Sequence, residues 1–314
     1  MDRLSLAGRY LEIASRGLEL GPSHNPTVRK SDGYPVEILD HATQAELRSK
    51  YVEHGLDQDS LDAIEEVDYI WSGGSMLDAI PETGVFHWII AAHFIEHTVD
   101  IVGFLADCTE LLVDGGSVLL IVPDKRYTFD RFRPLTSLGD ALDQSHRSTR
   151  FHPVGAMVDE SANAVWTNGA LTAVPGTTGV VTTRSETLES VLRAEAAALA
   201  QTEYHDVHRW IFTPKSLGLL VEDLAELGRH GLRVEAIETF DSYEFVVVLR
   251  KSAQPFVRSQ RRVEAMLAIE DELLGSDVNM LRAELEAMRT SISWRVTAPL
   301  RSAHTLVRRM FRTR

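Results

Sequence analysis

The sequence predicts an α/β fold in which a doubly wound, mostly parallel sheet is followed by a C-terminal helical extension. Three observations support this. Five short apolar segments alternate with helical segments before residue 124, which is typical of a doubly wound sheet. One of them, 86–92, is largely apolar, as expected for a parallel strand buried on both faces. Beyond residue 255 the apolar spacing changes to that of one long charged helix.

The expected elements follow one another along the chain. The apolar segments predict strands at 17–21, 36–39, 67–71, 86–92, 117–122, 233–240 and 245–249. Helical spacing predicts helices at 2–16, 43–53, 102–112, 187–201 and 216–229. The glycines after Asp114 predict a helix C-cap, because glycine readily adopts the left-handed conformation that ends many helices. The result is a Rossmann-like sheet, and such sheets bind ligands at the carboxyl ends of their strands.

Three regions are expected along the chain. Residues 1–250 form the α/β domain, and within it 130–210 is a less regular insertion rich in Gly and Thr. Residues 251–290 form a long charged helix, a candidate coiled coil or docking helix. Residues 291–314 form a basic amphipathic tail.

The charge of the chain is unevenly distributed. The formal net charge is −14, which argues against nucleic acid as a partner because phosphate binding needs a basic surface. Residues 291–314, however, contain six arginines and no acid. Together with Trp294 and Phe311, they suit an interfacial helix that docks on a membrane or a protein, and a solvated tail is the alternative.

Cysteine content and hydropathy indicate the compartment. Cys108 is the only cysteine, so neither a disulfide framework nor a cysteine zinc cluster is expected. The N-terminus lacks the apolar stretch of a signal peptide, and no run approaches the ~18 apolar residues that span a bilayer. A cytoplasmic address is expected, with a peripheral position at the inner membrane face left open by the tail.

The turn after the first strand is the first candidate ligand site. Gly21 lets the backbone approach a ligand that a Cβ would repel, and Glu19 offers a carboxylate for an ammonium group. The N–H groups of the turn would face the ligand near a helix start. Asp40 closes the second strand, where an acid can accept hydrogen bonds from both ribose hydroxyls. A purely steric turn and a solvated Asp40 are the alternatives.

Six segments in this order carry a resemblance to a known family. They are LELGPSHNPT (18–27), EILDHA (37–42), VDYIWSGG (67–74), WIIAAHFIEH (88–97), LLVDGGSVLLIVPDKRYTFD (111–130) and HDVHRWIFTP (205–214). The chain resembles class I S-adenosylmethionine-dependent methyltransferases over about residues 15–250, specifically the type 11-like kind associated with bacterial glycan-assembly clusters.

The resemblance implies S-adenosylmethionine as cofactor and assigns its contacts. Glu19 and Gly21 would contact the methionine part, Asp40 the ribose, Ser72 and Gly73 the adenine, and Ala92 and His93 the floor near the sulfonium, with Ser23 as a further cofactor contact. The chain departs from the family at several places. Ser23 and Asn25 replace the usual later glycines of the turn, while Ser72 and His87 stand where acids are common.

The resemblance further implies methyl transfer to a hydroxyl of a glycan or glycan precursor. An alcohol needs a base, and two clusters offer one. His97 follows the fourth strand beside Glu96. In 204–214, alternation in an extended segment would put Asp206 and His208 on one side, so that Asp206 orients His208 as the base. Helix capping and a structural lid segment are the alternatives.

Other chemistries remain open. His205 and His208 lie three residues apart, but no HExxH motif is present and further zinc ligands are not apparent, so no metal is expected. The alternatives in function are methyl transfer to a non-sugar N or C acceptor, and an inactive relative that serves as a binding module.

Overall fold

The structure is a computed structural model, and it describes residues 2–147, 149–185, 187–200, 202–252 and 262–275. The chain divides into two units, Met1–Ile269 and Glu270–Arg314. All elements discussed below belong to the first unit. In the extension expected at 251–290, Lys251 is the last residue of a strand and residues 262–275 are helical, while the tail expected at 291–314 lies outside the described residues.

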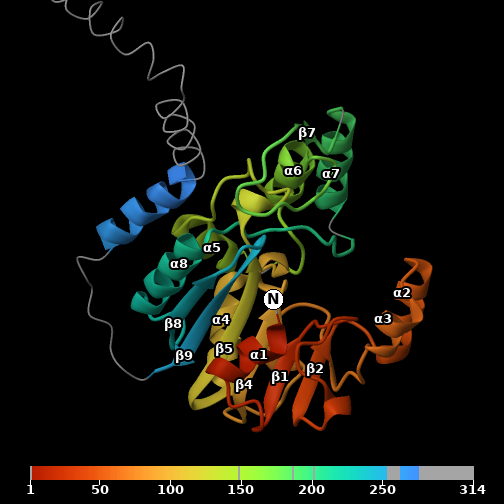
Figure 1. Cartoon of the computed structure of the whole chain (residues 1–314), viewed down its shortest axis with the longest axis vertical. Helices are drawn as coiled ribbons and strands as arrows, with labels where there is room; N and C mark the ends of the chain where they lie inside the picture. Colours follow the sequence, from red (N-terminus) through yellow and green to blue (C-terminus); the bar gives the residue numbers. More distant parts are fainter. Residues whose placement is uncertain (1, 148, 186, 201, 253–261, 276–314) are drawn as a thin grey trace, which may run out of the picture. The chain divides into compact units, whose positions relative to one another are not determined.

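The first unit is built on a seven-stranded sheet of order β3-β2-β1-β4-β5-β9-β8 (Figure 1). The strands are β1 (Gly17–Leu20), β2 (Val36–Asp40), β3 (Tyr69–Ile70), β4 (Phe86–Ala92), β5 (Leu112–Pro123), β8 (Leu232–Thr239) and β9 (Glu244–Lys251). β1 to β5 are parallel, and β9 is antiparallel to both neighbours. The chain winds outward from β1 in both directions. This confirms the doubly wound α/β fold and puts the topological switch point between β1 and β4.

Alternation along β5 explains why the sheet is buried on both faces. Val118 and Leu120 belong to the core cluster shared with α4 (Ile101–Leu111) and α8 (Pro214–Glu226). Leu119 and Ile121 belong to the cluster on the other face, with α1 (Arg3–Tyr10). Successive side chains of a strand point to opposite faces, so a continuous apolar run requires cover on both.

The remaining elements lie mostly outside the sheet. The helices are α2 (Gln44–Glu53), α3 (Gln58–Asp62), α5 (Leu138–Ser145), α6 (Val154–Asn163) and α7 (Glu189–Ala200). Single 3-10 turns are η1 (Lys30–Asp32), η2 (Met76–Asp78), η3 (Ile95–His97) and η4 (Lys125–Tyr127). β6 (Val165–Thr167) and β7 (Val181–Thr183) form a separate two-stranded sheet. The region expected as an irregular insertion therefore carries its own helices and strands.

Helix ends follow their capping residues. Thr43 caps α2 in a capping box with Glu46. Thr213 caps α8, and Pro214 occupies its first turn, where proline loses no helical hydrogen bond. α8 therefore starts two residues before the expected position, Ser216.

Three expectations were wrong in detail. The helix expected at 2–16 ends at Tyr10, because Leu11 is already extended. The glycines after Asp114 do not cap a helix. They lie within β5, where the pairing with β4 shifts register between Phe86 and Trp88, and Gly115 has a φ of 77°. A helix start was expected after the first turn, but the structure places only η1 between β1 and β2.

No helix among the described residues has the length and apolar character needed to cross a membrane.

Candidate functional site

The carboxyl ends of β1 and β4 carry unusual backbone conformations. Gly21, Ser23 and His93 have φ values of 58°, 49° and 50°. Such values are uncommon in residues other than glycine and persist only where the surroundings enforce them, often at ligand sites. Here they flank the topological switch point, which is where a doubly wound sheet binds its ligands.

Gly21 is required by its neighbours as well as by its backbone. A Cβ at this position would lie 2.8 Å from the ring of Phe94, which follows β4. The N–H of Gly21 donates to the carbonyl of Leu39 at 2.8 Å, which ties the first turn to β2. A glycine is therefore needed here because of the ring of Phe94, and the predicted approach of a ligand to its backbone stays a prediction.

Asp40 joins the end of β2 to the first turn. Its buried carboxylate accepts a hydrogen bond from the N–H of Ser23 at 3.1 Å and from that of His41 at 2.7 Å. The structure thus brings together Ser23 and Asp40, as expected from the sequence. Each carboxylate oxygen has two lone pairs, so Oδ2 can accept a further hydrogen bond from a ligand hydroxyl.

Glu19 has an internal role. Its side chain is buried and accepts hydrogen bonds from the N–H groups of Thr27, at 2.7 Å, and Val28, at 3.1 Å. Burial raises the pKa of Glu19 to about 7, although these backbone donors oppose the shift. Since both oxygens hold the loop, we assign Glu19 a structural role and leave it out of the cofactor contacts proposed below.

Ser72 and Gly73 follow β3 at the same edge of the sheet. Gly73 and Gly74 have φ values of 94° and 85°, so the chain turns sharply here. The preceding Trp71 lies 5.7 Å from Phe94, measured between ring centroids. Trp71 and Phe94 therefore form an aromatic pair at the carboxyl edge of the sheet, where the segments after β3 and β4 meet. Sequence reasoning did not identify this pair.

His93 follows Ala92, the last residue of β4, and bridges two carboxylates. Its Nε2 lies 2.7 Å from Glu244 and its Nδ1 lies 3.4 Å from Glu96. Burial lowers the pKa of His93, but the hydrogen bond with Glu244 and the ion pair with Glu96 outweigh this and raise it to about 9. His93 is therefore a cation at neutral pH. Arg3 also pairs with Glu244, at 3.0 Å.

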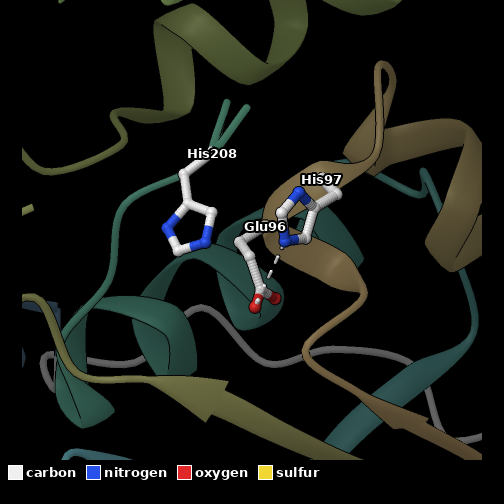
Figure 2. A group of neighbouring side chains, drawn as sticks. All are labelled: Glu96, His97 and His208. Atoms are coloured by element: carbon white, nitrogen blue, oxygen red, sulfur yellow. Dashed lines mark ion pairs between the residues drawn. The ribbon is translucent and has the colours of Figure 1, made fainter. Parts of the chain in front are cut away.

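A second group of residues lies just beyond β4, where the segment around His208 meets η3. The N–H groups of Arg209 and Trp210 both donate to the carbonyl of Glu96, at 2.7 and 3.2 Å. This contact brings His208 beside His97, with ring centroids 4.7 Å apart and an interplanar angle of 87°. Figure 2 shows both rings with the side chain of Glu96. Two histidines that are far apart in sequence thus form one cluster.

The carboxylate partners of these histidines differ from the expectation. Asp206 pairs with His97, with 2.8 Å between its Oδ1 and Nδ1, and Asp130 pairs with Nδ1 of His208 at 2.5 Å. The prediction that Asp206 orients His208 was wrong. It assumed a regular strand, whereas the segment before α8 has no regular secondary structure and follows its contacts to Glu96 instead.

His208 is held from several sides. Its backbone N–H donates to the carboxylate of Glu160 at 2.8 Å, and its backbone carbonyl accepts from Arg133 at 2.6 Å. Arg133 also pairs with Asp130 at 2.7 Å. Burial raises the pKa of Asp130, but His208 and Arg133 bring it below its usual value. An ionised Asp130 keeps a proton on Nδ1 of His208 and turns Nε2 toward the cluster.

Three of these supports were missed by sequence reasoning, namely Asp130, Arg133 and Glu160. Asp130 closes one of the quoted segments, but it lies 78 residues from His208, and no local pattern links the two. Only tertiary contacts through the insertion bring them together.

His205 and His208, which lie three residues apart in the sequence, do not form a common metal site. Nε2 of His205 lies 3.9 Å from Glu203, and His205 does not join His208 in the cluster. Among the described residues, Glu96, His97 and His208 are the group whose ligand atoms gather, all within 4.8 Å of one another.

Comparison with known proteins gives only a likeness in fold. No family model matches the sequence, and no curated protein sequence matches it either. Solved structures of S-adenosylmethionine-dependent methyltransferases are similar at low identity. That from Aquifex aeolicus is 12% identical, with 80% of this chain and 89% of that chain covered and a TM-score of 0.39. That from Methanosarcina mazei is 13% identical (79% and 98% covered, TM-score 0.41), and that from Mesorhizobium loti is 12% identical (78% and 95%, 0.40).

Proposed function

We propose that the protein is an S-adenosylmethionine-dependent methyltransferase that acts on a hydroxyl of a glycan or glycan precursor. The observation that carries this proposal is the position of a carboxylate-backed histidine, His208, beside the end of β4, next to the switch point of a doubly wound sheet. The candidate cofactor site at the switch point and the candidate base His208 are therefore close to each other. Fold by itself does not establish function, so the proposal rests on this site.

The residues at the switch point fit the cofactor. Gly21 has the positive φ of a tight turn at the end of β1, and Asp40 has an acceptor position for a ribose hydroxyl. Ser23, Ser72, Gly73, Ala92 and His93 complete the proposed contacts.

When bound, the cofactor supplies a methyl group on a positively charged sulfur. The chain must then place the acceptor oxygen and remove its proton, because an alcohol is a weak nucleophile. Nε2 of His208 accepts that proton in this proposal, and Asp130 stabilises the resulting imidazolium. His97, backed by Asp206, stands next to it as a second candidate base.

The preference for an oxygen acceptor follows from this base. A neutral amine needs no deprotonation before attack, whereas a hydroxyl does. The glycan class is supported by the quoted sequence segments alone. Docking of the tail 291–314 on a membrane or a partner is a further proposal, and it concerns residues outside those described.

Calorimetric titration with S-adenosylmethionine and S-adenosylhomocysteine tests the cofactor site. We expect micromolar binding by the wild-type chain and at least tenfold weaker binding by Asp40→Ala, equivalent to about 1.4 kcal/mol. Glu37→Gln is the matched control. It lies on the same strand, but its partners are Arg16 and Tyr69, away from the carboxyl edge.

The second candidate function is a binding module without catalysis. It is favoured by the buried, fully engaged Glu19 and by the lack of an α-helix between β1 and β2, which removes a helix dipole from the first turn. No cofactor binding by a folded wild-type chain would support this candidate and exclude the methyltransferase.

A further inference from the structure

The side chain of Glu96 lies in an unusual environment. It is fully buried, and neither carboxylate oxygen has a hydrogen-bond partner in the described part of the chain. The nearest opposite charges are the rings of His93, 3.4 Å away, and His97, 4.0 Å away. A buried carboxylate without hydrogen bonds is costly unless a cation compensates it. His93 compensates this charge in part, but it also pairs with Glu244, and both oxygens of Glu96 remain without hydrogen bonds, so a further cation would be stabilised beside them.

The two histidines that face Glu96 have a similar arrangement. Nδ1 of His97 is paired with Asp206, and Nδ1 of His208 is paired with Asp130. Nε2 of His97 is directed at Glu96, and a nitrogen of His208 faces the same carboxylate (Figure 2). A histidine that binds a metal through one ring nitrogen commonly gives the other N–H to a carboxylate, which fixes its tautomer and orientation. His208 has that support from Asp130, whereas His97 has the Asp206 carboxylate 2.8 Å from Nδ1 as an ion pair only.

We propose that Glu96, His97 and His208 bind one divalent transition-metal ion, for which zinc is the best match. Two imidazoles and one carboxylate are a known donor set for catalytic zinc, with a fourth position open to water or substrate. The nitrogen donors and the single carboxylate argue against calcium and magnesium, which prefer oxygen ligands. Cys108, the only thiol, is buried in the core and does not contribute.

The three ligand atoms must move only a short distance to bind one zinc ion. Zinc bonds of about 2.1 Å in a tetrahedron place ligand atoms about 3.4 Å apart. The donor atoms here lie within 4.8 Å of one another, and Nε2 of His97 is 4.0 Å from Glu96. His208 is fixed by Asp130 and by its backbone contacts, so His97 and Glu96 would close the distance. The side chain of His97 is one-quarter exposed and so is less enclosed than that of His208, which is 10% exposed.

The sequence predicted no metal because it suggested the pair His205 and His208, without further ligands. The structure replaces His205 with His97 and adds Glu96 from η3. A metal ion on Nε2 of His208 would prevent that atom from accepting a proton, so His208 cannot be the base and a metal ligand at the same time. This conflict arises only if the proposed function holds, whereas metal binding itself does not depend on that function.

The test is metal uptake by the full-length chain without cofactor. The protein is stripped with a chelator, dialysed and titrated with zinc, and zinc is quantified by elemental analysis after gel filtration. We expect one zinc per chain with submicromolar affinity. His208→Gln, His97→Gln and Glu96→Gln should each weaken binding at least a hundredfold. His205→Gln, four residues before Arg209 on the same segment, is the control and should bind like the wild type.

Cobalt provides an independent readout on the wild-type chain. Loading with Co²⁺ should produce the intense visible absorption of a four-coordinate ion, and this band should be lost in His97→Gln. Thermal unfolding of each metal-free variant shows whether it is folded. Because His97 is partly exposed, its variant should remain folded even if Glu96→Gln does not.

Two outcomes would overturn the metal site. One is a folded wild-type chain that takes up no zinc or cobalt. The other is equal uptake by wild type, His97→Gln and His208→Gln, which would show an adventitious ion only. Titration with S-adenosylhomocysteine, carried out separately, shows whether the cofactor site holds, so failure of either proposal is recognised on its own.

Discussion

The candidate cofactor region and the candidate catalytic region, both at the carboxyl edge of the sheet, are built in different ways. Beside β1 and β2, the site consists largely of backbone, with positive φ at Gly21 and Ser23 and one carboxylate, Asp40, that fastens the turn. Beyond β4, it consists of side chains that several distant segments contribute. The first depends on local chain geometry, and the second depends on tertiary contacts. Substitutions should therefore affect them differently.

The largest expected effect is in the catalytic region. His208→Asn should lower kcat for methyl transfer by about 10²- to 10⁴-fold, because the acceptor hydroxyl loses its base. Affinity for S-adenosylhomocysteine should stay within twofold of wild type, since the first turn is untouched. Release of S-adenosylhomocysteine with hydroxylated sugar acceptors measures the first quantity, and calorimetry measures the second.

A parallel loss of cofactor affinity in His208→Asn would show that the two regions are one unit. His205→Gln is the control for general damage to the segment, and its kcat should be unchanged.

The second effect concerns the backbone region. Gly21→Ala should destabilise the chain more than Gly33→Ala by about 1–3 kcal/mol, the usual range for overpacking. Both glycines have positive φ, but a Cβ at Gly21 meets Phe94 at 2.8 Å, whereas a Cβ at Gly33 meets nothing within 4 Å. The free energy of unfolding of both variants is measured in urea. Because both positions carry the same kind of backbone strain, the difference reports the contact with Phe94.

Gly21→Ala should also weaken cofactor binding, whereas Gly33→Ala should not. Equal stability and equal affinity of the two variants would mean that the approach of Phe94 to Gly21 has no energetic weight.

A third experiment separates the two carboxylate–histidine pairs. Asp130→Asn should lower methyl transfer about tenfold to a hundredfold, the usual range for a residue that orients a functional histidine. Asp206→Asn should have a smaller effect, because its partner is His97 and its side chain is 78% exposed. Comparison of kcat for the two variants measures this difference, and the reverse order would restore the pairing of Asp206 with His208 that the sequence suggested.

The smallest effect is on stability at alkaline pH. The pKa of His93, about 9 in the folded chain, exceeds its ordinary value of 6.5, so protonation stabilises the folded state. This contribution is complete below pH 6.5 and is lost as the pH rises through 9. We expect His93→Gln to remove about 1–2 kcal/mol of the decline in unfolding free energy between pH 6.5 and 9.5.

Chemical denaturation at several pH values measures this decline. His87→Gln, an exposed position on the same strand, should leave the pH dependence as in wild type. An unchanged decline in His93→Gln would show that the ion pairs with Glu244 and Glu96 contribute nothing to folding.

Much of the sheet could be predicted because its signals are local. The apolar run 86–92 and the segment ending at Asp40 correspond to β4 and β2. Errors arose where tertiary pairing overrides local preference. Leu112 joins β5 because it pairs with Phe86, so the following glycines become part of the strand and not a helix end. Leu11 packs into the core without being helical.

The candidate site could likewise be predicted only where local signals determine it. Asp40 and Ser23 lie together because strand order and chain direction dictate it. The partner of His208 could not be predicted, because Asp130 is 78 residues away and no periodicity spans the insertion. Glu19 misled for the opposite reason. Its position at the strand was right, but the burial of its side chain under Thr27 and Val28 is a property of the folded loop.

The double hydrogen bond to the carbonyl of Glu96 has an evolutionary consequence. It fastens residues 209–210 to η3, just beyond β4, and Glu160 fastens His208 to α6. The chain between α6 and His208 is thus held at both ends by contacts that also position the proposed base. Segments of different length and composition can be exchanged between these anchors while the imidazole keeps its position. Under the proposed function, acceptor preference would change in that stretch without a change in the position of His208.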